Sequence, residues 1–191
     1  MIAAIPWIGQ YAAERGLRYE PDADERWLRA WEPYATLKSP IRYEHALLST
    51  GSGGSLTLAR LVVTTEGGVE ASAWIAIVQD VRLTLHAAAT SDKPGTFGEP
   101  LDLVSLRRRR TGDAPFDAAF ASFAATQEDL AGAITPSVRK LVMGWRLPLH
   151  FELRSGGFVV APVALAANPA SLAWLVGAVE LFGEKAAKSA G

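Results

Sequence analysis

The sequence predicts an α+β fold in a single domain, residues 1–191. We expect an antiparallel β-rich N-terminal part, then two helices, a β-hairpin and a C-terminal packing helix. Short runs of β-type residues, separated by glycine-rich turns, fill residues 42–88, as in antiparallel strands. Beyond residue 126, helical spacing and strand alternation follow one another in short segments. Hydrophobic residues make up 49% of the 191 residues, so a core can form without a metal or a disulfide.

The first elements are two helices with a short strand between them. Residues 6–15 carry apolar side chains at helical spacing, and Gly16 stands where a helix usually ends. Residues 17–19 are a candidate strand. A second helix is predicted from an N-cap at Asp24 to a stop at Pro33, which places Trp27 and Trp31 one turn apart on the same face. That spacing is typical of core packing, and both tryptophans are also candidate interaction anchors.

Four strands are predicted next, at residues 42–49, 56–65, 69–79 and 81–87. Glycine-rich turns at 51–54 and 66–68 join the first three as a meander. Residues 90–99 are predicted to form a loop, and 101–106 one more strand. The polar run at 107–113 then interrupts the apolar pattern, and it is a candidate sub-boundary between a β-rich part and a mixed part.

The second part is predicted to contain three helices and a hairpin. Thr126 and Thr135 are N-caps for two helices, the second of which ends at Gly144. Residues 147–154 alternate as an amphipathic strand, and a turn at 155–157 leads into a second strand at 158–165. Asn168 caps the last helix, whose apolar stripe is expected to pack on the sheet.

Charge and composition exclude several functional classes. The chain has 19 Lys and Arg against 20 Asp and Glu, so we expect no nucleic-acid partner, which would favour a basic domain. With no cysteine there is no thiolate nucleophile and no cysteine-based zinc site, and we expect no metal and no cofactor. The uncharged stretch 155–179 is broken by glycine and proline, so no membrane span is expected. The first residues lack the basic start of a signal peptide, and we expect a cytoplasmic protein.

No catalytic motif occurs in the chain. His45, His86 and His150 are far apart in sequence and are predicted to be surface residues of strands. There is no His-Glu-x-x-His motif and no Gly-x-Ser-x-Gly nucleophile elbow. The glycine-rich run 51–55 lies between two strands and is predicted to be a turn rather than a phosphate cradle. The sequence therefore favours a protein that is not an enzyme and leaves an enzyme open as an alternative.

One cluster of charge stands out, at Arg107, Arg108, Arg109 and Arg110. One interpretation is a solvated loop whose arginines pair with Asp113, Asp117 or the acidic residues at 22–25. The alternatives are an acidic protein partner, or contact with phosphates of nucleic acid or anionic lipid. These four arginines are therefore candidate interaction residues.

The segment 111–120 carries a resemblance. A Gly-Asp pair, then Phe116-Asp117, then Phe120, followed by a helix that begins at Thr135-Pro136, is similar to a loosely defined group of uncharacterised bacterial proteins. A stretch like 13–19 precedes it in them, and some carry an N-terminal membrane anchor, which we do not expect here. The resemblance implies no activity. From the residues themselves, we expect Asp113 to cap the turn and Asp117 to accept backbone N–H bonds. Phe116 and Phe120 are expected to anchor the segment in the core.

Two functions remain open at this point. The first is a non-catalytic module that binds a protein partner or itself, which predicts an exposed apolar patch of several hundred Å². The second is a small-molecule or lipid-binding domain, less readily a hydrolase, with Trp74, Trp145 and Phe151 lining a pocket. A hydrolase would also need a histidine within hydrogen-bond reach of an acid or nucleophile.

Overall fold

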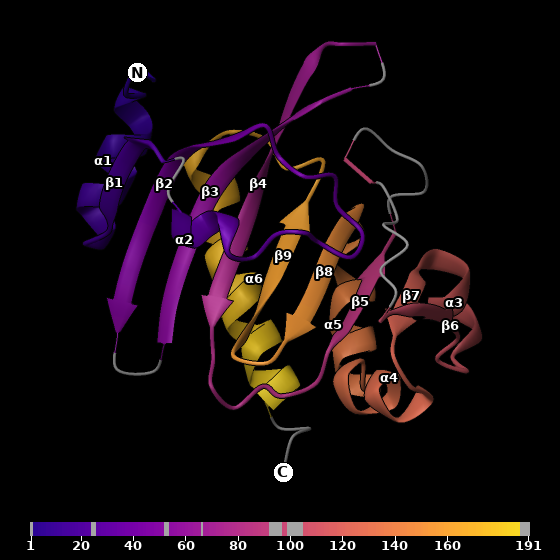
Figure 1. The fold of residues 1–191 in the computed structure, drawn as a ribbon. Coiled ribbons are helices and arrows are strands. Elements are labelled where there is room, and N and C mark those ends of the chain that lie inside the picture. Colours follow the sequence, from indigo (N-terminus) through magenta and orange to yellow (C-terminus); the bar gives the residue numbers. More distant parts are fainter. Residues whose placement is uncertain are drawn as a thin grey trace.

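The computed structural model describes residues 2–23, 26–51, 54–65, 67–91, 97–98 and 105–187. These residues form a nine-stranded sheet in the order β1-β2-β3-β4-β9-β8-β5-β7-β6, with every pairing antiparallel (Figure 1). The strands are β1 (Arg18–Asp22), β2 (Arg42–Gly51), β3 (Gly54–Thr64), β4 (Glu70–Gln79), β5 (Ala87–Thr90), β6 (Arg107–Arg109), β7 (Ala121–Ala124), β8 (Leu149–Arg154) and β9 (Gly157–Pro162). The two predicted halves therefore share one sheet.

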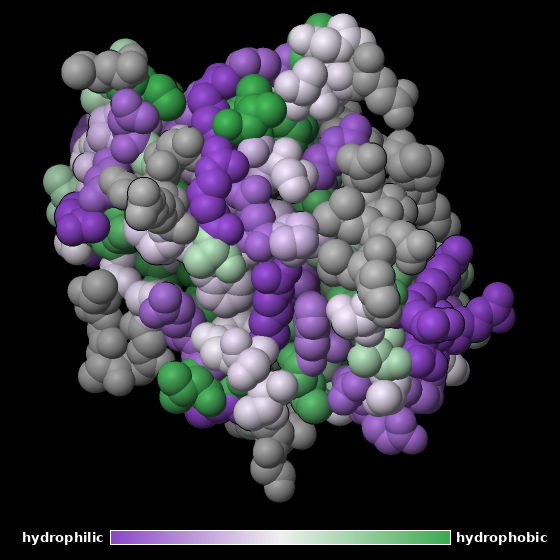
Figure 2. Space-filling view, in the orientation of Figure 1, coloured by the Kyte–Doolittle hydropathy of each residue, from purple (hydrophilic) through white to green (hydrophobic). Residues whose placement is uncertain are grey.

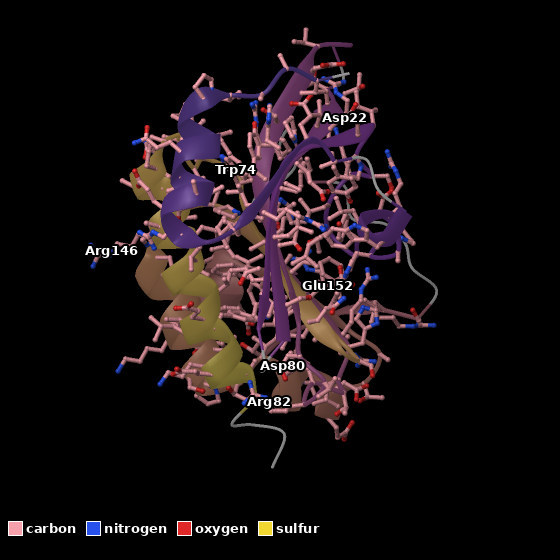
Figure 3. The ribbon with its side chains drawn as sticks, turned by 90° about the vertical axis from the view of Figure 1, so that its left-hand side faces the viewer. Asp22, Trp74, Asp80, Arg82, Arg146 and Glu152 are labelled. Carbon is pink, nitrogen blue, oxygen red and sulfur yellow. The ribbon has the colours of Figure 1, made fainter. Side chains whose placement is uncertain are left out.

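Helices and a long connection cover the two faces of this sheet. The helices are α1 (Pro6–Arg15), α2 (Arg26–Arg29), α3 (Ala114–Ala119), α4 (Gln127–Ala133), α5 (Pro136–Trp145) and α6 (Pro169–Ala187). Helices α1, α5 and α6 lie on one face, while α2 and residues 30–41, which we name the strap, cross the other (Figures 1 and 3). Because both faces are covered, successive side chains of strand β4 enter two different cores. Trp74 and Ala76 belong to the core under the helices, and Ile75 and Ile77 to the core under the strap.

Local signals explain where the helices begin and end. Thr126 and Asp129 form a complete capping box at α4, and the Asn168 side chain accepts a hydrogen bond from the Ser171 N–H at 2.9 Å. Helix α1 ends at Gly16, which has a φ of 63°. Gly157 at the start of β9 is required by space, because a Cβ there would lie 2.1 Å from the Val78 carbonyl oxygen. These features confirm the predicted fold class, from the β-rich start to the helix–helix–hairpin–helix ending.

Three predicted elements differ from the structure. Residues 81–86 are not a strand, because the Asp80 carboxylate accepts hydrogen bonds from the backbone and side chain of Arg82 and holds a turn there. Helix α2 ends at Arg29 rather than at Pro33. Residues 107–109, predicted as an interruption, are strand β6. The predicted N-cap at Asp24 and residues 101–104 of the predicted strand lie outside the described residues.

Length and apolar character decide whether a helix can span a membrane. Among the residues that the structure describes, no helix combines the length and the apolar character needed to span a membrane.

Candidate functional site

Strand β6 is the last strand of the sheet order and carries the arginine cluster. We name Arg107, Arg108, Arg109 and Arg110 the arginine edge. β6 pairs with β7 on one side, and no described strand pairs with its other side. Figure 2 shows hydrophilic side chains gathered at the end of the molecule where β6 and α3 lie. An edge strand keeps N–H and C=O groups free for pairing with another chain.

The four arginines differ in how their side chains are used. Arg109 is half-buried, and its guanidinium donates to the carbonyl oxygens of Ala124 and Ala125. Arg107, Arg108 and Arg110 are exposed, and within the described part of the chain none of their guanidinium groups forms an ion pair or a hydrogen bond. One arginine therefore fastens the strand to its neighbour, and three remain available to a partner.

Two of the acidic residues predicted to pair with these arginines, Asp113 and Asp117, have other partners, and Asp24 and Glu25 lie outside the described residues. Arg139 Nε donates to Asp113 Oδ2 at 3.0 Å. Asp117 accepts hydrogen bonds from the backbone and hydroxyl of Thr111 and from the Gly112 N–H. Burial raises the pKa of Asp117, but these bonds and the nearby charge of Arg110 outweigh burial and leave the pKa below its ordinary value.

The local predictions for segment 111–120 are confirmed. Asp113 is the N-cap of α3 and accepts from the Phe116 N–H at 3.3 Å. Phe116 and Phe120 are buried and stack with ring centroids 4.6 Å apart. The segment is thus a rigid corner, and it fixes the position of the chain beside β6.

A polar hollow of about 390 Å³ lies at this corner. It is lined by Arg108, Arg109, Arg110, Asp117, Phe120 and Ser122. Ser122 sits opposite Arg109 in the β6–β7 register, so the two side chains share one face of the sheet. Ser122 is 1% exposed, and its Oγ has no hydrogen-bond partner among the described residues. A buried hydroxyl without a partner is unusual in a folded protein.

A second hollow, mostly apolar and about 290 Å³ in volume, shares Phe120 with the first. Its lining is Ser91, Ala119, Phe120, Val142, Met143, Arg146, Leu147 and Pro148. Arg146 follows α5 with a φ of 54°, a left-handed conformation uncommon for arginine. Figure 3 shows the Arg146 side chain pointing outward on the helical side of the sheet, opposite Glu152. Two hollows of different polarity thus have Phe120 as a common lining residue.

The other charged cluster of interest lies under the strap. Glu152 of β8 is 2% exposed, and it accepts from Arg154 Nε at 2.6 Å and from the Ala35 N–H at 2.8 Å. His86 Nε2 lies 2.8 Å from Glu152 Oε1. Arg154 also donates to the Pro33 carbonyl oxygen. We name Glu152, Arg154, His86 and Ala35 the latch, because they tie the strap to the sheet.

A hydrolase needs a histidine within hydrogen-bond reach of an acid or nucleophile, and in the latch His86 lies within that distance of Glu152. However, the Glu152 carboxylate is occupied by three donors and closed off from solvent. Burial raises the pKa of Glu152, and the hydrogen bonds from His86 and Arg154 reverse that effect and lower it. Glu152 is therefore held as a carboxylate in a fixed structural contact.

The prediction that the histidines are surface residues is wrong for His45 and His150. His45 is buried beside Tyr19, whose hydroxyl lies 2.8 Å from His45 Nδ1. His150 is buried under the strap, with its Nδ1 3.2 Å from Thr36 Oγ1. His86 alone is partly exposed. Across the residues described, no group of three or more His, Asp or Glu side chains could hold a metal ion.

The candidate aromatic residues mostly serve packing. Trp27 and Trp31 are half-buried against the core under the strap, so their role as interaction anchors stays a prediction. Trp74 and Phe151 are buried in the helix-side core, and Trp145 packs against Trp174. Trp74, Trp145 and Phe151, which were predicted to line a pocket, line neither of the two hollows.

An interaction module was predicted to carry an exposed apolar patch, and the exposed hydrophobic side chains of the described residues do not gather into one. Large hydrophobic side chains that are exposed in the described part of the chain lie on different segments; they are Ile41, Val69, Val81 and Leu181. Figure 2 shows apolar residues in separate groups between polar ones on the strap face. Any partner contact at the arginine edge therefore depends on charge.

Comparisons with known proteins bear on the fold. No family model matches the chain, and no curated protein matches it. The structure is similar to the crystal structure of the mycobacterial trehalose monomycolate transport factor A, TtfA, with a TM-score of 0.66 and 13% sequence identity. The match covers 94% of this chain and 92% of that chain. At this identity the likeness shows a shared fold. The resemblance of segment 111–120 to uncharacterised bacterial proteins stays a prediction.

Proposed function

We propose that the protein is a non-catalytic interaction module that docks through the arginine edge onto an acidic segment of a protein partner. The observation that carries this proposal is the pair Arg107 and Arg108, exposed on an edge strand with no ion pair among the described residues. Charged groups that a protein leaves unpaired steer and orient a complementary partner. An extended acidic segment running beside β6 would meet both the arginines and the free backbone groups of the edge.

A differential capture experiment tests this proposal. Tagged wild-type protein, the variant R107A/R108A and the control K140A are used as baits in lysate of the source cells, with quantitative mass spectrometry. Lys140 is an exposed cation of α5 with no ion pair among the described residues, so K140A removes the same charge type elsewhere. We expect a partner that wild type and K140A retain and that R107A/R108A loses.

The captured partner is then purified and its affinity measured at two salt concentrations. We expect binding to weaken about tenfold in R107A/R108A, and to weaken with salt in wild type, as screening of exposed charges requires. Equal capture by wild type and R107A/R108A would contradict docking at the edge. The cytoplasmic location expected from the sequence belongs to this proposal, and cell fractionation tests it.

The second candidate function is the binding of a small molecule or lipid. The observation that favours it is that Phe120 lines both the polar and the apolar hollow. Ligand sites of this kind combine apolar walls with a few polar groups. The name of the similar structure, a trehalose monomycolate transport factor, supports a lipid-related role for this candidate. Saturable binding of an amphiphilic probe with a defined stoichiometry tests this candidate.

A further inference from the structure

We propose that the polar hollow between β6, β7 and α3 is a binding site for a phosphate-type oxyanion. The inference rests on ligand binding, the second function proposed above, and the hollow shares Arg108, Arg109 and Arg110 with the arginine edge. The shared chemistry is a tetrahedral anion with several acceptor oxygens. Its source is either a water-soluble phosphate compound or the head group of a lipid.

The charges that line the hollow indicate that its ligand is negatively charged. Three arginines line the hollow against a single acidic residue, Asp117. The carboxylate of Asp117 already accepts three hydrogen bonds, two from Thr111 and one from Gly112. Its charge is thus stabilised by the turn of its own segment, and the hollow keeps an excess of positive charge that favours an anion.

The unpartnered Ser122 hydroxyl is an independent observation that points to a ligand. Tyr11 and Trp74 also have a buried polar atom without a partner in the described residues, but neither lines either of the two hollows. Leaving a buried hydroxyl unpaired destabilises a folded protein. An oxyanion in the hollow would accept a hydrogen bond from the Ser122 hydroxyl and relieve that destabilisation.

Arginine geometry favours a phosphate-type group over a simple halide. A guanidinium presents several N–H donors in a planar fork that matches two oxygens of one anion. Arg110 has no hydrogen bond from its guanidinium within the described residues, and it lies near enough to Asp117 to lower that carboxyl's pKa. Its five donors are therefore free at the wall of the hollow.

The dimensions leave space for a substituent on the anion. The polar hollow of about 390 Å³ falls within the range of about 300–1,000 Å³ seen for small-molecule sites. Phe120 also lines the apolar hollow, which has Arg146 among its lining residues. An alkyl group attached to the oxyanion has an apolar surface available next to its head.

NMR titration of the 15N-labelled chain tests the inference, with inorganic phosphate and decyl phosphate below its micelle concentration as probes. We expect saturable shifts at residues 107–122 with both probes. Ser122→Ala and Arg110→Ala should each weaken phosphate binding about tenfold, the effect of one hydrogen bond to a charged group. The matched controls Ser155→Ala and Lys140→Ala, at exposed positions on other elements, should bind as wild type. The spectra themselves report whether each variant is folded.

The two probes distinguish the sources of the oxyanion. If the ligand is a lipid head group, decyl phosphate binds at least about tenfold tighter than phosphate, a gain that burial of a few CH₂ groups supplies. That gain should disappear in Met143→Glu, which places a charge in the apolar hollow. Equal affinities for the two probes would assign a water-soluble phosphate compound.

The inference is overturned if neither probe gives saturable shifts, or if Ser122→Ala and Arg110→Ala both bind phosphate as wild type does. Failure here is distinguishable from failure of protein docking, because Ser122→Ala leaves the exposed arginines in place. A Ser122→Ala chain that loses phosphate and keeps its protein partner would separate the two sites.

Discussion

Arginine side chains are used in opposite ways in two regions of the sheet, the latch and the arginine edge. In the latch, the Arg154 guanidinium donates to the buried Glu152 carboxylate and to the Pro33 carbonyl oxygen. At the arginine edge, Arg107 and Arg108 have no partner among the described residues. The latch lies in the middle of the sheet under the strap, and the edge is the last strand of the sheet.

The difference indicates which cluster serves the fold and which serves binding. A buried charge must be paired, because an unpaired one carries a large desolvation cost. An exposed charge has no such requirement, and its contribution to stability is small. We therefore assign Glu152 and Arg154 to holding the strap and the arginine edge to contact with partners. The predictions below separate the two assignments.

Glu152→Gln should have the largest effect on stability. The change removes the charge that Arg154 and His86 contact, so we expect a loss of about 3 kcal/mol in the free energy of unfolding. Denaturant unfolding followed by tryptophan fluorescence measures this loss. Glu128→Gln, at an exposed position of α4, is the control and should change little. A loss below about 1 kcal/mol in Glu152→Gln would show that the latch does not hold the strap.

Asp113→Ala should have an intermediate effect. The variant loses the N-cap of α3 and the ion pair with Arg139, so we expect a loss of about 1–2 kcal/mol. Asp113→Asn keeps a capping oxygen and should lose less. Thermal denaturation of both variants gives the order, and an equal loss would assign the whole effect to the ion pair.

Acid should weaken the protein in two steps. Burial and the charge of Arg60 lower the pKa of His45, so its contribution to stability is present above the unfolded value of 6.5 and is lost as pH falls through the folded pKa. Glu152, also lowered, loses its contribution as pH falls below its unfolded value of 4.5. Unfolding measured from pH 8 to pH 3 should show both slopes. His45→Asn should abolish the upper slope, and its persistence would assign that slope to another group.

The double variant R107A/R108A should have the smallest effect on stability. Neither guanidinium forms a hydrogen bond or an ion pair with a described residue, so the change in unfolding free energy should stay within about 0.5 kcal/mol of wild type. The same denaturant unfolding measures it. A larger loss would show that these arginines serve the fold.

Much of the fold could be predicted from the sequence, because local signals mark it. Capping residues such as Thr126 and Asn168 identify the starts of helices, and the glycine-rich turn at 66–68 identifies the start of the strand that follows it, β4. The short elements α3 and β7 were missed, since four to six residues show too little periodicity to detect. His150 was misassigned because the strap that buries it is distant in sequence, which alternation along one strand cannot reveal.

The candidate site was only half predictable. The four adjacent arginines are evident from the sequence, and the capping role of Asp113 is indicated by Pro115 two residues further along the chain. Ser122 gave no signal, since its importance comes from the absence of a partner in space. Phe120 lines both hollows, and His86 pairs with Glu152. Both arrangements likewise depend on segments that are far apart in the chain.

The most direct test of the central claim is to measure binding and stability together on one edge variant and one latch variant. The protein partner retained by wild type is titrated against R107A/R108A and Glu152→Gln, and both variants are unfolded in parallel at a temperature where each is folded. We predict that R107A/R108A loses binding and keeps its stability, while Glu152→Gln loses stability and keeps its binding. An R107A/R108A chain that binds the partner as tightly as wild type would contradict the account.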